Sequence, residues 1–138
     1  MASWDPDTYA FYRRYREWPA LDLLTAIPRD LDPLDIWDLG CGLGEQAALL
    51  AARHPRARVR GLDSSPEMLE RAKALPAKVE WILSDIGDFA PKTPAGLIFS
   101  NAALQWVDDH ATLVPHLAEC LAPGGVLAIQ MPVADGLG

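Results

Sequence analysis

Short apolar segments alternate with helix-type segments along most of this chain, and this alternation restricts its fold more than any other feature. Strand patterns are predicted at residues 34–39, 57–62, 79–83, 95–102 and 126–131. Helix patterns are predicted between them, at residues 44–54, 65–75 and 112–121. Strands that alternate with helices form a parallel sheet with helices on both faces. The sequence therefore predicts a doubly wound α/β fold.

Proline and glycine place several of the predicted boundaries. Ser65 is a suitable N-cap and Pro66 suits the first position of a helix. Pro115 is compatible with its helix only if that helix begins near Thr112, because proline disrupts a helix interior. The segment Pro-Gly-Gly at 123–125 predicts a turn before the last strand.

Composition and charge limit the class of protein. The chain has 138 residues, of which 50% are hydrophobic, and a net charge of −7, which argues against nucleic acid as a partner. No apolar run has the roughly 20 residues that a membrane span requires, and the start of the chain is unlike a signal peptide. Cys41 and Cys120 do not form a disulfide framework. A cytoplasmic protein is expected.

Three glycines lie between the first predicted strand and its helix. Asp38 is followed by Gly40, Gly42 and Gly44, and parallel sheets bind ligands where such strands end. A tight turn without a ligand and a dinucleotide-binding loop are the alternatives. The dinucleotide loop is disfavoured, because Glu45 replaces its last glycine and Asp38 adds a second negative charge near a pyrophosphate.

Two further acids follow the next predicted strands. Asp63 is well placed to accept both hydroxyl groups of a ribose, with helix capping as the alternative. Ser64 and Ser65 are available as caps, so Asp63 is expected to be free for a ligand. Asp85 is placed to accept from an adenine amino group, with Ile86 packing on the ring, or it is an ordinary loop acid.

The motifs DLGCGLG, GLDSSPEML, SDI and LAPGGVLAI resemble those of class I S-adenosylmethionine-dependent methyltransferases in order and spacing. The resemblance implies a Rossmann-like, mostly parallel methyltransferase sheet in residues 34–138. It also implies an N-terminal helical region, residues 1–33, over the substrate side. The family fold continues with two more strands that this chain does not contain, so the chain is expected to be C-terminally incomplete.

The same resemblance implies S-adenosyl-L-methionine as cofactor and S-adenosyl-L-homocysteine as product. It assigns cofactor binding to Asp38, Gly40, Cys41, Gly42, Gly44, Asp63, Ser64, Asp85, Ile86 and Asn101. Asn101 would also face the side from which the methyl group leaves. The pocket wall would comprise Ala102, Leu104, Gln105 and Trp106.

A narrower resemblance is to trans-aconitate 2-methyltransferases, through WDPDTY, LIFSNAALQWVDDH and LAPGGVLAIQMP. It implies O-methylation of a carboxylate of a small organic acid to a methyl ester, with Arg16 positioning the acid. That family tends to show Arg-x-Arg-Pro where this chain has Trp18 in place of one arginine. A carboxylate is ionised at neutral pH and needs no general base. His110 and His116 are therefore expected to be helix-surface residues, and no metal site is expected.

Two other classes of function stay open at this stage. One is an NAD(P)-dependent oxidoreductase on the same type of sheet. The other is a truncated or non-catalytic S-adenosylmethionine-binding fragment. The uncharged segment 126–131 would then be an unpaired strand at the side of the sheet, with apolar surface left open beside it, and self-association through it is expected.

Overall fold

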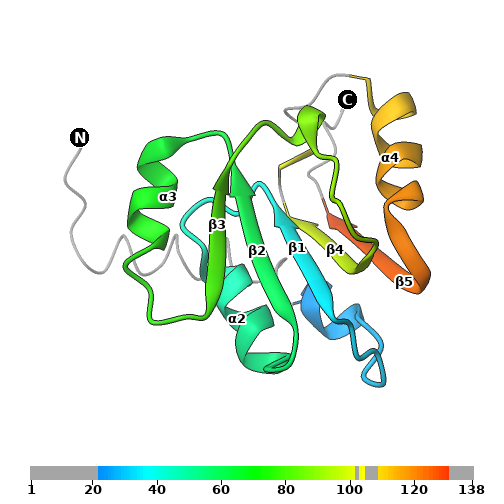
Figure 1. Cartoon of the computed structure of the whole chain (residues 1–138), viewed down its shortest axis with the longest axis horizontal. Helices are drawn as coiled ribbons and strands as arrows, with labels where there is room; N and C mark the ends of the chain where they lie inside the picture. Colours follow the sequence, from blue (N-terminus) through cyan, green and yellow to red (C-terminus); the bar gives the residue numbers. More distant parts are fainter. Residues whose placement is uncertain (1–21, 102, 105–108, 131–138) are drawn as a thin grey trace.

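The computed structural model describes residues 22–101, 103–104 and 109–130. In these residues one parallel sheet has the strand order β3-β2-β1-β4-β5 (Figure 1). The strands are β1 (Asp35–Leu39), β2 (Arg58–Asp63), β3 (Val79–Leu83), β4 (Ala95–Asn101) and β5 (Leu121–Gln130). The predicted doubly wound sheet is confirmed, and its strand order reverses between β1 and β4.

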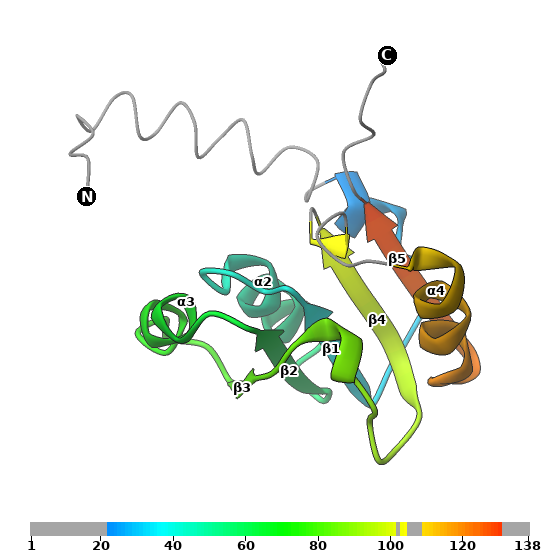
Figure 2. The ribbon, with the colours of Figure 1, turned by 90° about the horizontal axis from the view of Figure 1, so that it is seen from above.

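Helices cover both faces of this sheet. They are α2 (Glu45–Arg53), α3 (Pro66–Ala72), the short 3₁₀ helix η1 (Ile86–Asp88) and α4 (His110–Glu119). Figure 2 shows α2 and α3 on one face and η1 and α4 on the other. Right-handed connections between parallel strands explain this arrangement. The sheet grows on one side of β1 through β2 and β3 and then on the other side through β4 and β5, so the connecting helices lie on opposite faces.

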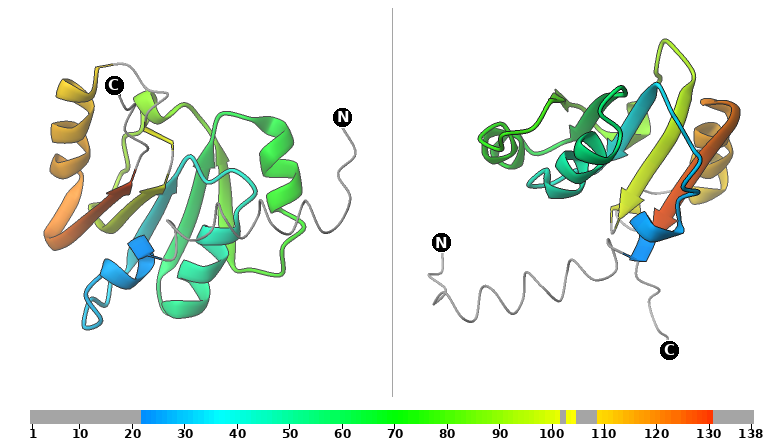
Figure 3. Two further views of the ribbon diagram at one scale, coloured as in Figure 1. Left: turned by 180° about the vertical axis from the view of Figure 1, so that it is seen from behind. Right: turned by 90° about the horizontal axis from the view of Figure 1, so that it is seen from below.

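Each face of the sheet has its own apolar core. One core lies under η1 and α4 and contains Trp37, Leu39, Phe89, Ile98 and Leu117. The other lies under α2 and contains Ile36, Leu50, Phe99 and Ala128 together with Leu24 and Ile27. The helical residues 22–26 therefore pack on the face that α2 covers, near β4 and β5 (Figure 3). The division of the chain at residue 33 stays a prediction.

The start of α4 differs from the prediction. The helix begins at His110, so Pro115 lies inside it and not in its first turn. The proline removes the N–H group that would bond to the Ala111 carbonyl. Ala111 is exposed and Pro115 lies on the same outer part of the helix, so water can satisfy this carbonyl.

The start of β5 also differs. The strand begins at Leu121, which pairs with Ala95, and the pairing shifts before Val126 pairs with Leu97. The predicted turn is therefore an irregularity within the strand, where Gly124 has a φ of 77°. In the described part of the chain, no helix is long and apolar enough to cross a membrane.

Candidate functional site

The carboxyl ends of the strands bring the predicted polar residues to one end of the sheet. Asp38 lies one residue before the end of β1, and Asp63 and Asn101 are the last residues of β2 and β4. Asp85 follows β3 by two residues and precedes η1. The parallel topology, more than any local motif, is what collects these side chains from distant parts of the sequence.

The glycine loop after β1 has a left-handed backbone at each of its glycines, but the space around each glycine differs. A Cβ atom on Gly40 would lie 2.3 Å from the Ala103 Cβ, and one on Gly44 would lie 2.5 Å from the Trp81 ring. A Cβ atom on Gly42 would meet none of the described residues within 4 Å, at a φ of 55°. Internal packing therefore accounts for two of the glycines, whereas Gly42 faces space that no residue of the described part of the chain fills.

Asp63 holds this loop to the start of α3. Its Oδ2 accepts a hydrogen bond from the Gly42 N–H at 2.9 Å, and its Oδ1 accepts one from the Ser65 N–H at 2.9 Å. The hydroxyl of Ser65 caps the helix by accepting from the Met68 N–H. The carboxylate of Asp63 thus takes part in holding the start of the helix, which was the alternative role, and its availability for a ligand stays a prediction. Ser64 is exposed.

Asp38 is a buried carboxyl group, with 2% of its surface exposed. Burial, and next the negative charge of Asp63, raise the pKa of Asp38 to about 7. Its Oδ2 is buried and has no hydrogen-bond partner among the residues that the structure describes. A buried acceptor without a donor costs free energy, so this oxygen needs a proton or a ligand.

Cys41 lies inside the glycine loop and is buried. Burial, and next the charges of Asp38 and Asp63, raise the pKa of its thiol far above the usual range. A Cβ atom on Gly61 would lie 3.0 Å from the Cys41 Sγ, so the sulfur fills the space over that glycine. The thiol stays protonated at neutral pH, which favours a packing role over a nucleophilic one.

Asp85 and Ile86 occupy the start of η1. The Asp85 side chain is exposed and accepts a hydrogen bond from the Gly87 N–H at 3.0 Å, which caps this helix. Ile86 is buried, and its Cδ1 lies 3.5 Å from where a Cβ of Gly40 would be. Ile86 therefore lies next to the glycine loop, and the adenine-binding role of Asp85 and Ile86 stays a prediction.

The end of β4 supplies two polar residues. The Oδ1 of Asn101 is buried and has no hydrogen-bond partner within the described ranges. Ser100, which sequence reasoning missed, is fully buried, and its hydroxyl donates to the Leu39 carbonyl at 2.8 Å. This bond joins the ends of β1 and β4. A serine at the end of an apolar strand segment was the signal in the sequence.

Both histidines of α4 contact backbone carbonyls of the chain. His116 Nε2 is 2.6 Å from the Phe89 carbonyl oxygen, and His110 Nε2 is bonded to that of Leu104. Both contacts are partly buried, so the expectation of helix-surface residues was only partly correct. Their contacts indicate a structural role.

Several predicted residues lie outside the described part of the chain. These are Arg16, Ala102, Gln105 and Trp106. Of the predicted pocket wall, Leu104 is described and fully buried. Within the described ranges, no group of three or more His, Cys, Asp or Glu side chains is arranged to hold a metal ion.

This fold and this arrangement of polar groups belong to a known class. A family model described as a methyltransferase domain matches residues 36–125, which is more than half of the chain. The chain therefore belongs to the methyltransferase-domain family, and the resemblance seen in its motifs is confirmed.

Curated relatives narrow the comparison. The chain is 50% identical over 132 residues to the trans-aconitate 2-methyltransferase of Azoarcus sp. (strain BH72), a match that covers 96% of this chain and 52% of the relative. It is 49% identical to the enzyme of that name from Methylobacterium radiotolerans, with 96% and 50% covered. The chain thus spans about half the length of the curated relatives that it matches.

Solved structures agree on the fold. The plantazolicin methyltransferase BpumL, crystallised with a pentazolic desmethylPZN analogue and SAH, matches with a TM-score of 0.73 at 26% identity over 91% of this chain and 53% of that one. An S-adenosylmethionine-dependent methyltransferase from Mesorhizobium loti matches with a TM-score of 0.67 at 32% identity, covering 84% and 53%.

Proposed function

We propose that this chain is the S-adenosylmethionine-binding part of a methyltransferase that converts a carboxylate of a small organic acid, of the trans-aconitate type, into a methyl ester. The observation that carries the proposal is the open space at Gly42, at the carboxyl end of the sheet where strand order reverses. The names of the curated relatives support the substrate class.

The residues at this end of the sheet fit such a cofactor. Asp63 would accept from the ribose hydroxyls through the lone pairs that its two backbone contacts leave over, with Ser64 nearby. Asp85 and Ile86 would hold the adenine. The amino-acid part would lie along the loop that contains Gly42. When bound, the cofactor supplies a sulfonium methyl group that is already activated for displacement.

The chain's own task would be to align the acceptor and to exclude water. An ionised carboxylate needs no base, and this agrees with the backbone contacts of His110 and His116. Arg16 would hold the acid, because a guanidinium group binds carboxylates in a fixed geometry. The acidic acceptor, the role of Arg16 and a cytoplasmic location stay predictions.

A dinucleotide cofactor fits the loop less well. A pyrophosphate needs free backbone N–H groups at the start of the first helix. Here the Gly42 N–H already donates to the Asp63 carboxylate, which places a negative charge directly behind the loop. A phosphate group would have to replace that contact and approach that charge.

Calorimetry and a labelled methyl donor test this proposal. We expect the chain to bind S-adenosylhomocysteine and not NADH, and to transfer methyl groups to trans-aconitate but not to its fully esterified form. Preference for NADH would contradict the cofactor assignment. Cofactor binding without transfer to any acid would favour a non-catalytic binding fragment.

We also propose that two copies of the chain associate through β5, which lies at the side of the described sheet. Ala128 is covered by the core that contains Leu24 and Ile27, and α4 packs against β5, so less apolar face is open than expected. Among the described residues, no strand pairs with the outer side of β5, so its backbone groups there would be available for pairing.

Light scattering of a Val126→Lys variant tests this association. We expect the unmodified chain to form dimers or larger species, and the variant to shift toward monomer because the two lysines would repel each other. Leu83→Lys, at an exposed residue of β3 on the opposite side of the sheet, is the control and should leave association unchanged. A monomeric unmodified chain across a concentration series would contradict the proposal.

A further inference from the structure

The indole ring of Trp81 crosses the neighbouring strand on the face of the sheet that α2 covers. Trp81 is in β3, directly opposite Gly61 of β2 in the register of these two strands. A Cβ atom on Gly61 would lie 2.7 Å from the Trp81 Cζ3 and 2.8 Å from its Cε3. The ring therefore occupies the space that a side chain at position 61 would take, which only glycine leaves open.

The far edge of the same ring reaches the last glycine of the loop after β1. A Cβ atom on Gly44 would lie 2.5 Å from the Trp81 Cη2 and 2.9 Å from its Cζ3. Gly44 is the N-cap of α2, so the loop ends and the helix begins at this contact. Ala72 of α3 lies against the same side of Gly44, its Cβ 2.9 Å from that position. A side chain of β3 thus supports the point where the loop joins its helix.

Asp63 and Trp81 hold the loop at different points and from different strands. The Asp63 Oδ2 accepts a hydrogen bond from the Gly42 N–H at 2.9 Å, whereas Trp81 packs against Gly44. The strand that carries Trp81 also leads to Asp85, the proposed adenine contact. The indole ring therefore connects the part of the proposed site that holds the adenine with the loop along which the amino-acid part would lie.

We infer that Trp81 is a positioning residue for the cofactor: it fixes the glycine loop relative to the end of β3, and it acts through Gly44 instead of by contact with the ligand. The inference rests on the proposed function and adds to it a residue that the proposed cofactor contacts do not include. A loop that is already held in its bound conformation loses less freedom on binding, so affinity is higher. The effect falls on the amino-acid part of the cofactor and spares the nucleoside.

Two ligands measure this difference. Trp81→Leu removes the ring atoms that lie against Gly44 and Gly61. In calorimetric titrations of the full chain, affinity for S-adenosylhomocysteine should fall about tenfold, whereas affinity for methylthioadenosine, which lacks the amino-acid part, should change by less than about twofold. Thermal unfolding identifies a temperature at which each variant is folded. Equal losses for the two ligands, or no loss for either, would overturn the inference.

Trp81→Phe is the milder second variant, because it keeps a ring but lacks the atoms that reach Gly44. It should show the same selective loss to a smaller extent, and it provides the test if Trp81→Leu does not fold. An affinity for S-adenosylhomocysteine that is unchanged in Trp81→Phe, in the absence of folded Trp81→Leu, would overturn the inference.

A change at Gly61 tests whether the ring transmits the effect. The added Cβ atom of Gly61→Ala would press on the Trp81 ring, so affinity for S-adenosylhomocysteine should fall by about threefold or more. In a chain that also carries Trp81→Leu, the ring atoms are gone and Gly61→Ala should cause a further loss of less than about twofold. Losses that simply add would overturn the inference.

Trp37→Leu is the matched control on the other face of the sheet. Trp37 is a buried residue of β1, and its ring centre lies 5.0 Å from that of Phe89. The variant should lose stability, because a large core side chain is shortened, but the ratio of the two ligand affinities should stay that of the unmodified chain. The same selective loss in Trp37→Leu would overturn the inference and leave the proposed function standing. Absence of S-adenosylhomocysteine binding by the unmodified chain would overturn both.

Discussion

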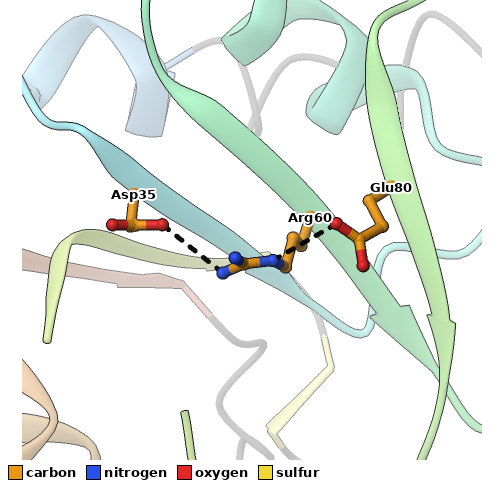
Figure 4. Close-up of polar contacts among 3 residues, drawn as sticks. All are labelled: Asp35, Arg60 and Glu80. Atoms are coloured by element: carbon orange, nitrogen blue, oxygen red, sulfur yellow. Dashed lines mark hydrogen bonds and ion pairs between the residues drawn. The ribbon is translucent and has the colours of Figure 1, made fainter. Parts of the chain in front are cut away.

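The acidic side chains at the two ends of the sheet have different partners. Near the amino end, Arg60 lies between Asp35 and Glu80, at 3.5 Å from each (Figure 4). Its guanidinium carbon also lies 4.9 Å from the centre of the Trp37 ring. Near the carboxyl end, the side chains of Asp63 and Asp85 accept hydrogen bonds from backbone N–H groups instead of from arginines. The Oδ2 of Asp38 accepts from no described residue.

Acids at the amino end are paired with arginines and stabilise the fold, whereas acids at the carboxyl end have no such partner and are available to a ligand. An acid that already forms an ion pair with an arginine of the chain gains little from a further bond to a ligand. A surface hollow by itself does not identify the ligand site, because a hollow of about 500 Å³ lies at the amino ends of β2 and β3. Glu80 in its lining is already paired with Arg60. The unpaired acceptors at the other end are the better guide to function.

The largest effect on ligand binding is expected from a side chain that fills the space at Gly42. Gly42→Val should abolish binding of S-adenosylhomocysteine, a loss of more than about a hundredfold, because the side chain would occupy the ligand's place. The left-handed backbone should also cost about 1–2 kcal/mol of stability. Calorimetric titration and thermal unfolding measure the two effects separately.

Gly124 offers a matched control for that variant. It too has a positive φ, 77°, and a Cβ atom added there would meet no described residue within 4 Å, but it lies in the irregular part of β5. Gly124→Val should show a similar loss of stability with binding unchanged. If both variants lose binding equally, backbone strain and not ligand space would explain the effect at Gly42.

Removing the carboxyl group of Asp38 should change how stability depends on pH. Its folded pKa of about 7 lies above the ordinary value of 3.8, so the folded state holds the proton more tightly and loses stability as pH rises between these values. Relative to the unmodified chain, Asp38→Asn should gain on the order of 4 kcal/mol between about pH 4 and pH 8. Denaturant unfolding across this range measures it, and a constant difference would show that Asp38 titrates normally.

Loss of Asp63 should affect binding and stability together. Asp63→Ala removes charge-assisted bonds worth about 1.5–3 kcal/mol, which corresponds to a roughly ten- to hundredfold loss of cofactor affinity. It also leaves the Gly42 and Ser65 N–H groups without their acceptor, at a cost of about 1–2 kcal/mol in unfolding free energy. Calorimetric titration with S-adenosylhomocysteine and denaturant unfolding measure the two losses.

Ser65→Ala is the control for Asp63. It removes the side-chain cap of α3 without touching the Gly42 contact, so it should lower stability by about 1 kcal/mol and leave affinity unchanged. An Asp63→Ala variant with normal affinity would contradict a ribose contact and leave Asp63 with its loop-holding role alone.

The sheet and the ends of its strands could be predicted because apolar alternation and the glycine loop are local signals. Asp38, Asp63 and Asp85 were predicted at one end of the sheet because parallel strands leave no other arrangement. The irregular start of β5 and the early start of α4 were missed. Each depends on pairing or packing with residues far away in the chain, and Pro115 argued locally against the longer helix.

The burial, pKa and hydrogen-bond partners of each acid also could not be predicted from the sequence. Nothing in the letters distinguishes Asp38, buried with a raised pKa, from Asp85, exposed and capping η1. Burial is set by the surrounding layers, and the double backbone contact of Asp63 depends on the path of the glycine loop. Ser100 was missed for the same reason, because its partner is a carbonyl on another strand.

The smallest effect is expected at the amino end, where Arg56 and Asp32 form an ion pair with both side chains largely exposed. Such pairs contribute between nothing and about 1 kcal/mol, because water screens the charges and both side chains lose conformational freedom. Asp32→Asn should therefore change unfolding free energy by less than about 1 kcal/mol, less still at high salt, and should not change S-adenosylhomocysteine affinity. Denaturant unfolding at two salt concentrations and calorimetric titration test this. A loss of affinity comparable to that of Asp63→Ala would mean that charge at the amino end also serves the ligand, and the contrast between the two ends of the sheet would no longer hold.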